Sequence, residues 1–104
     1  MKKTFNLKID GKHPERLLEA IKHEIRKYLA RERRKPLPKG ADFWDFDCRF
    51  GASEETAEAV RVGAITELIN ASAASGAEQF YIELLARPGQ RVLKTPVVSY
   101  DKAE

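Results

Sequence analysis

The chain has 104 residues, of which 42% are hydrophobic and 34% are charged, and its formal net charge is +3. This length predicts a single domain, and the apolar fraction excludes an intrinsically disordered chain. The single cysteine, Cys48, excludes an intramolecular disulfide and a cysteine-based zinc site, and it is typical of the cytoplasm. No apolar run is long enough for a signal peptide or a membrane span.

The first third of the chain predicts a strand followed by a long helix. Residues Thr4 to Ile9 alternate between polar and apolar side chains, which is typical of a half-buried strand. Pro14 is typical of a first helical position. From Pro14 to Lys35 the apolar residues recur on one helical face, so we expect a long amphipathic helix that ends before Pro36.

Two further segments have the alternation of strands. Residues Phe43 to Phe50 alternate without a fault, and Gln79 to Ala86 alternate in the same way until Pro88 and Gly89, which we expect to end the strand. In the first of these strands one set of side chains is expected to face inward: Trp44, Phe46, Cys48 and Phe50. Residues 91–104 are predicted to be a disordered C-terminal tail.

Residues 54–76 permit two interpretations. They form either one helix capped by Ser53, or a strand from Thr56 to Val62 followed by a helix from about Ala64 to Ser75. We favour the strand and helix, because Gly63 inside a single helix would cost about 1 kcal/mol relative to alanine.

The resulting order is strand, helix, strand, strand, helix, strand, within one α+β domain over residues 1–90. It predicts a ferredoxin-like βαββαβ sandwich, with a four-stranded antiparallel sheet and two helices on one face. The alternative, if residues 54–76 are one helix, is a three-stranded sheet with two helices.

The positive charge is concentrated at the N-terminal end of the sequence. Residues 1–35 contain twelve Lys or Arg and five Asp or Glu, a net charge of +7, whereas residues 36–104 contain seven and eleven, a net charge of −4. On the helix, the side opposite the apolar stripe carries Arg16, His23, Lys27, Arg31 and Arg34. Such a row can neutralise phosphates, which predicts nucleic acid or another anionic partner. The alternative is an ordinary solvated face, with Glu19, Glu24 and Glu32 interleaved.

A second candidate site lies on the strand that starts at Phe43. Alternation places Asp45 and Asp47 on one side, with Arg49 next along the same face, and this set predicts a small-ligand site on the open face of the sheet. The alternative is cross-strand ion pairing of the two aspartates, with Arg61 or Lys8 as the partner. No catalytic residue, metal site or cofactor is predicted, and Cys48 is expected to be buried and inert.

The sheet face that the helices leave open also suggests self-association. Its expected apolar members are Phe43, Ala57, Ala59, Tyr81 and Leu85, and a homodimer through this face is one interpretation. The leading prediction is a small cytoplasmic, non-enzymatic binding or interaction domain that contacts an anionic partner through its basic first helix. The alternative is a small-ligand-binding or enzymatic dimer that uses the open sheet face.

Three segments together resemble a small family of bacterial proteins of unknown function: HPERLLEAIKHEIRKYLARERRKPLP, DFWDFDCRFG and EQFYIELLARPG. The resemblance extends over roughly residues 1–90. It implies a bacterial, cytosolic, free-standing domain, and it assigns no activity, ligand or site residue.

Overall fold

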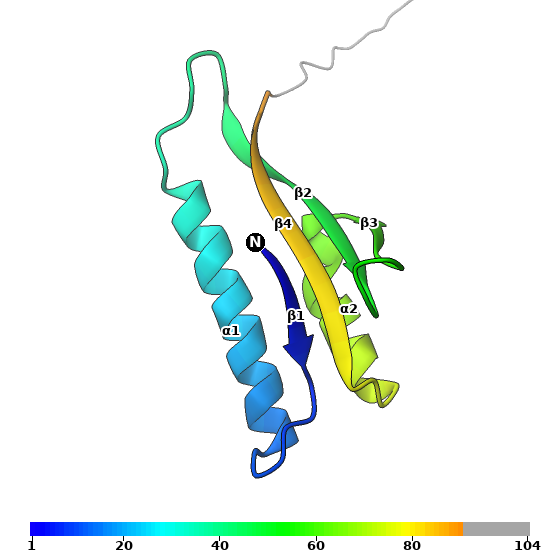
Figure 1. Ribbon diagram of the computed structural model, residues 1–104. Coiled ribbons are helices and arrows are strands. Elements are labelled where there is room, and N and C mark those ends of the chain that lie inside the picture. Colours follow the sequence, from blue (N-terminus) through cyan, green and yellow to red (C-terminus); the bar gives the residue numbers. More distant parts are fainter. Residues whose placement is uncertain (91–104) are drawn as a thin grey trace, which may run out of the picture.

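The structure, a computed structural model, describes residues 1–90 and contains the predicted sequence of elements (Figure 1). The predicted tail over residues 91–104 lies outside the described residues. The elements are β1 (Lys2–Asn6), α1 (Pro14–Arg33), β2 (Phe43–Gly51), β3 (Glu58–Val60), the short 3₁₀ helix η1 (Val62–Ala64), α2 (Ile65–Ala74) and β4 (Gln79–Gly89).

The four strands form one antiparallel sheet in the order β1-β4-β2-β3. Both βαβ units are split, because β4 lies between β1 and β2, and β2 lies between β3 and β4. The α+β class, the βαββαβ order and the four-stranded antiparallel sheet are therefore confirmed. In this sheet the two central strands are β4 and β2. In the ferredoxin-like order the central strands are the first and the third, so the order of strands here differs from that one.

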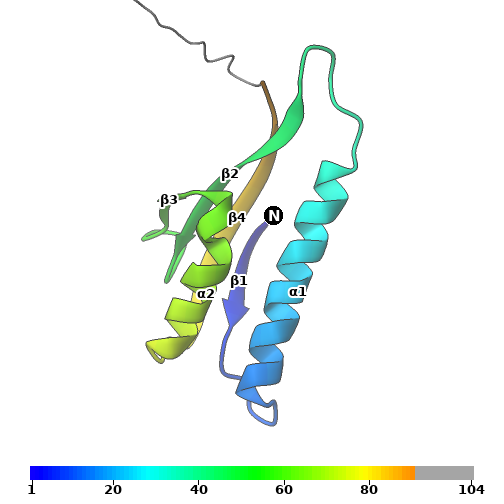
Figure 2. The same ribbon diagram turned by 180° about the vertical axis from the view of Figure 1, so that it is seen from behind.

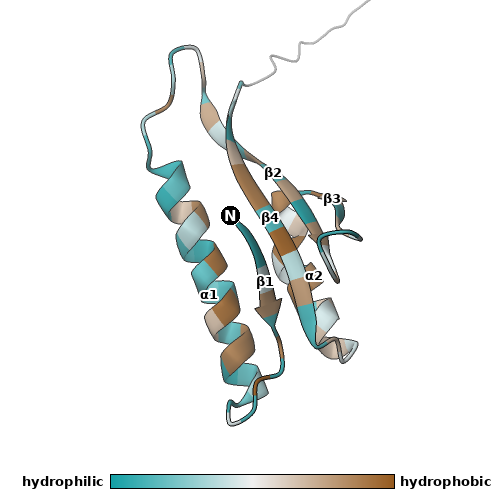
Figure 3. Cartoon of the chain, in the orientation of Figure 1, coloured by the Kyte–Doolittle hydropathy of each residue, from teal (hydrophilic) through white to brown (hydrophobic). Residues whose placement is uncertain are grey.

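Both helices cover the same face of the sheet, as the view from behind shows (Figure 2). The hydrophobic colours of Figure 3 run along the middle of β4 and alternate with hydrophilic ones on α1. The buried core joins the two layers and comprises Phe5, Leu7, Ile21, Ile25, Leu29, Phe46, Cys48, Ile65, Ile69, Phe80, Ile82 and Leu84. Within it the Phe80 ring stacks against Phe5 and Phe50, with centroid distances of 5.4 and 5.0 Å. Burial of each large apolar side chain contributes about 1.5–3 kcal/mol.

The strand-and-helix interpretation of residues 54–76 is confirmed, and the one-helix and three-stranded alternatives are wrong. Pairing of Cys48 with Val60 and of Phe50 with Glu58 adds β3 to the edge of β2. Gly63 lies in η1, where it separates β3 from α2. The helix-forming residues therefore start only after this break, and the strand is shorter than expected because only Glu58–Val60 reaches β2.

The prediction that Pro88 and Gly89 end the last strand is wrong, since β4 continues through both and pairs with β2 as far as Gly89. Pairing with β1 stops at Glu83, and a backbone bond from the Leu84 N–H to Met1 follows it. Beyond this point one edge of β4 is open, and a proline is tolerated at such an edge because its missing N–H interrupts no ladder there. Of the helices in residues 1–90, none combines the length and apolar character needed to cross a membrane.

Candidate functional site

The solvent side of α1 forms a basic face, defined by Arg16, His23, Lys27, Arg31 and Arg34. All five side chains are exposed. The opposite side of the helix buries Ile21, Ile25 and Leu29 in the core. The helix is amphipathic because its apolar residues recur every three or four positions, and packing of that stripe on the sheet turns the basic face to solvent. The predicted basic row therefore exists as a surface.

The three glutamates interleaved along α1 form ion pairs with lysines outside the basic face. The pairs are Lys3–Glu24, Lys22–Glu19 and Lys35–Glu32, with N–O distances of 2.8, 2.9 and 2.9 Å. Hydrogen bonding to Lys22 also lowers the pKa of Glu19. Within residues 1–90 no ion pair reaches Arg16, His23, Lys27, Arg31 or Arg34. Within residues 1–90 the cations of the basic face therefore form no ion pair with the acidic residues of their own helix.

Two arginines near the end of α1 lie over aromatic rings. The Arg31 guanidinium is 5.5 Å from the centroid of the Tyr28 ring, and the Arg33 guanidinium is 5.3 Å from that of Phe46. A cation–π contact at an exposed site contributes about 0.5–1 kcal/mol, and it orients the side chain without removing its charge. Exposed Lys39, in the loop that follows, adds another cation beyond this end of the helix.

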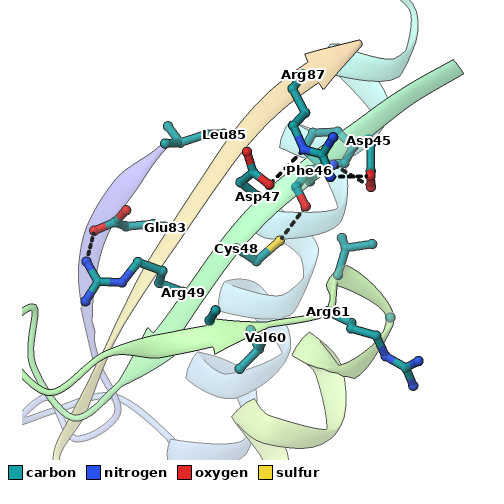
Figure 4. Close-up of a pocket in the computed structure, with 13 residues that line it drawn as sticks. Asp45, Phe46, Asp47, Cys48, Arg49, Val60, Arg61, Glu83, Leu85 and Arg87 are labelled. Carbon is teal, nitrogen blue, oxygen red and sulfur yellow. Dashed lines mark hydrogen bonds and ion pairs between the residues drawn. The ribbon is translucent and has the colours of Figure 1, made fainter. Parts of the chain in front are cut away.

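The open face of the sheet carries the second candidate site. Asp45 and Asp47 lie on the same side of β2, as expected, and Arg87 of β4 reaches both of them (Figure 4). Its Nε donates to Asp47 Oδ1 at 2.7 Å, and its Nη2 donates to Asp45 Oδ2 at 2.9 Å. The hydrogen bond to Asp47, with the negative charges of both aspartates, raises the pKa of Arg87.

The partner expected for the aspartates, Arg61 or Lys8, is therefore wrong. In Figure 4 the Arg61 side chain points away from the two carboxylates, and the Lys8 ammonium donates to the Gly76 carbonyl. Sequence reasoning missed Arg87 because the pairing of β4 with β2 is not visible in the sequence. The available signal was that Arg87 continues the alternation of Glu83 and Leu85 one residue past the predicted end of the last strand.

Arg49 does not join the two aspartates but pairs with Glu83 on β4. Its Nη1 donates to Glu83 Oε2 at 3.2 Å, and its Nη2 donates to the Ala57 carbonyl at 2.6 Å. Glu83 is only 6% exposed, and its Oε2 also accepts a hydrogen bond from the Tyr81 hydroxyl at 2.8 Å. Burial, together with this bond to a carboxylate, raises the pKa of Tyr81 to about 12.

A recess of about 870 Å³ lies beside these residues, at the edge of β2 beyond the end of β3. Its lining includes both ion-paired groups and the segment that follows β3: Asp45, Asp47, Arg49, Arg61, Val62, Gly63, Glu83, Leu85 and Arg87. The volume is in the range of small-molecule sites. Each aspartate, however, accepts a charge-assisted hydrogen bond from Arg87, so the pair is arranged as an ion-pair cluster rather than as a free acid and base.

The apolar part of the open face is smaller than expected. Tyr81 and Ala57 are 5% and 6% exposed, so neither is available to a partner. Among its large apolar side chains, Phe43 and Leu85 are exposed, at 37% and 43%.

Cys48 is buried, as predicted, and faces the helices. Burial, with a smaller contribution from the charges of Asp45 and Asp47, raises the pKa of its thiol to about 11. A neutral, enclosed thiol is a poor nucleophile.

Within residues 1–90 no three His, Cys, Asp or Glu side chains are grouped so as to hold a metal ion. No curated protein and no solved structure matches the chain. One family model, described as "Family of unknown function (DUF6172)", matches residues 1–95. The resemblance to a family without known activity is thus confirmed, and the chain belongs to the family of unknown function DUF6172.

Proposed function

We propose that this protein is a non-enzymatic binding domain that holds nucleic acid by the basic face of α1. One observation carries the proposal: the interleaved glutamates pair with other lysines, which leaves Arg16, Lys27 and Arg34 exposed and without an ion pair among residues 1–90. Cations arranged in this way release counterions when they neutralise phosphates, and this release favours binding without any base-specific contact.

A salt titration of oligonucleotide binding tests the proposal. The logarithm of the affinity is expected to fall linearly with the logarithm of the salt concentration, by about 0.7–0.9 per phosphate neutralised. The variant Lys27→Gln/Arg34→Gln removes two cations of the basic face, so the slope should become shallower by about 1.4–1.8. An unchanged slope in this variant would show that the contact lies elsewhere.

A matched control comes from Lys12 and Arg61, which are exposed and outside the basic face. Neither forms an ion pair with another residue of the described range. The variant Lys12→Gln/Arg61→Gln makes the same change in net charge and the same pair of substitutions. It should retain the wild-type slope, because neither cation belongs to the basic face. An effect of overall charge alone would instead change both variants equally.

A second candidate function uses the recess on the open face, where Asp45, Asp47 and Arg49 would bind a small ligand, in a monomer or in a homodimer through this face. The volume of the recess and the buried carboxylate of Glu83 in its lining favour it. Amide-shift NMR with small carboxylates, phosphates and amines tests it, since specific binding should move the backbone amide resonances of Asp47 and Leu85.

Sedimentation of wild type and Leu85→Lys tests the homodimer. The new charge on the open face should dissociate such a dimer.

A further inference from the structure

The aromatic side chains of residues 1–90 provide no platform on which unpaired bases could stack. Proteins that bind single strands place aromatic rings along a basic groove. Here four aromatic residues are buried, Phe5, Phe46, Phe80 and Tyr81, and Phe50 packs against the same core. Exposed Phe43 lies on the open face of the sheet, away from the basic face. Its ring also covers the Cα of Gly89, where an added Cβ would be 2.6 Å from the ring.

Two partly buried aromatic residues, Tyr28 and Trp44, are tied to the protein itself near the end of α1. The Tyr28 ring lies under Arg31, and its hydroxyl donates to the Leu84 carbonyl at 3.4 Å. The indole Nε1 of Trp44 donates to the Lys35 carbonyl at 2.8 Å. Both rings are half-buried. The Arg31 guanidinium already covers one face of Tyr28, and part of each ring is covered by the protein.

The shape of the basic face matches a rigid duplex. Eighteen positions separate Arg16 from Arg34, and at about 1.5 Å per residue the face is about 27 Å long. Over that length a B-form duplex presents a phosphate charge about every 1.7 Å, against about 3.4 Å for one strand, so the same cations meet twice the charge density. A helix of about 10–12 Å diameter also fits the major groove, which is about 12 Å wide.

The chemistry of the same face favours backbone contact over base recognition. Helix α1 contains no Asn or Gln, the residues that form paired hydrogen bonds with adenine. Two alanines, Ala20 and Ala30, lie among the cations on the solvent side. The exposed lysine and arginine side chains can reach phosphates on both sides of a groove, and such contacts position a protein without reading sequence.

We infer that the ligand of α1 is double-helical DNA, bound through its phosphates without sequence preference. This inference rests on the proposed function. It adds that the helix lies along the major groove and that single strands are the weaker ligands.

Fluorescence anisotropy with four mixed-sequence ligands of equal length tests the inference: DNA duplex, RNA duplex, DNA single strand and RNA single strand. The DNA duplex should bind about tenfold more tightly than either single strand, and a second duplex of unrelated sequence should bind equally. The RNA duplex should bind more weakly than the DNA duplex, because the deep, narrow major groove of A-form RNA does not admit the helix. Lys27→Gln/Arg34→Gln should weaken duplex binding, and Lys12→Gln/Arg61→Gln should not.

Failure of the inference can be distinguished from failure of the proposed function. Single strands that bind as tightly as the duplex would overturn the inference and leave nucleic-acid binding intact. An RNA duplex bound as tightly as the DNA duplex would overturn the placement in the major groove. No binding to any of the four ligands, or equal effects of the two double variants, would overturn the proposed function itself.

Discussion

Arg49 and Glu83 face each other across the two central strands and form an ion pair in which one partner is buried and the other half exposed. The N–O distance is 3.2 Å, and the side chains are 43% and 8% exposed respectively. The two residues are directly opposed in the β2–β4 register. Because Arg49 also donates to the Ala57 carbonyl, the pair connects both central strands to the segment that leads into β3.

This arrangement predicts that the two arginines of the open face differ in their contribution to stability. Arg49→Leu leaves the buried Glu83 carboxylate without its cation and should lower the free energy of unfolding by about 2–3 kcal/mol. Arg87→Leu removes two exposed ion pairs and should cost less than about 1 kcal/mol. Chemical denaturation of both variants measures the difference. Equal losses would show that the burial of Glu83 has no energetic consequence.

The hydroxyl of Tyr81 provides a pH-dependent test of the same cluster. Because burial and the bond to Glu83 raise its pKa from 10.0 to about 12, the folded protein keeps a proton that the unfolded chain releases. The contribution to stability is complete below about pH 10 and is lost as the pH rises to about 12. Absorbance titrations of wild type and Tyr81→Phe should therefore coincide up to about pH 11. An earlier divergence would contradict the buried hydrogen bond.

The sequence predicted well those features that depend on local periodicity. The apolar stripe of α1, the alternation of β2 and the buried position of Cys48 each depend on neighbours a few residues away, and the structure has all three. The basic face follows from the same pattern, because the side of a helix opposite its apolar stripe must face solvent.

The features that the sequence did not predict depend on which strands are neighbours. Arg87 reaches Asp45 and Asp47 only because β4, and not β3, pairs with that part of β2. The continuation of β4 past Pro88 likewise depends on where β1 stops. Both are properties of sheet order and register, which a single sequence does not specify when several strands have similar alternation.

Two glycines near β3 are expected to respond in opposite ways to alanine. A Cβ at Gly51 would lie 2.7 Å from the Ala57 Cα and 3.0 Å from the Thr56 carbonyl oxygen. These are backbone atoms, so Gly51→Ala must displace the chain and should cost about 1–3 kcal/mol. At Gly63 no atom lies within 4 Å of the added Cβ, and Gly63→Ala should be neutral or stabilising by up to about 1 kcal/mol. Thermal denaturation of the two variants makes the comparison, and a stable Gly51→Ala protein would contradict the close approach of β2 and the segment before β3.

The single thiol of the chain gives the most direct measure of how well the core is closed. With a pKa of about 11, Cys48 is about one-thousandth thiolate at about pH 8, and the residue is 4% exposed in the folded protein. A thiol-specific reagent should therefore react with the native protein far more slowly than with the protein in denaturant, where the pKa returns to about 9.0.

The same shift in pKa makes stability depend on pH in the alkaline range. The folded protein binds the thiol proton more tightly than the unfolded chain does, so this contribution is complete below about pH 9 and is lost as the pH rises to about 11. Cys48→Ala should lower stability at neutral pH, because it removes a buried side chain, yet its stability should fall less steeply than that of wild type between about pH 9 and pH 11. Parallel curves, together with rapid labelling of the native protein, would mean that solvent reaches Cys48 and that the helices do not close over this part of β2.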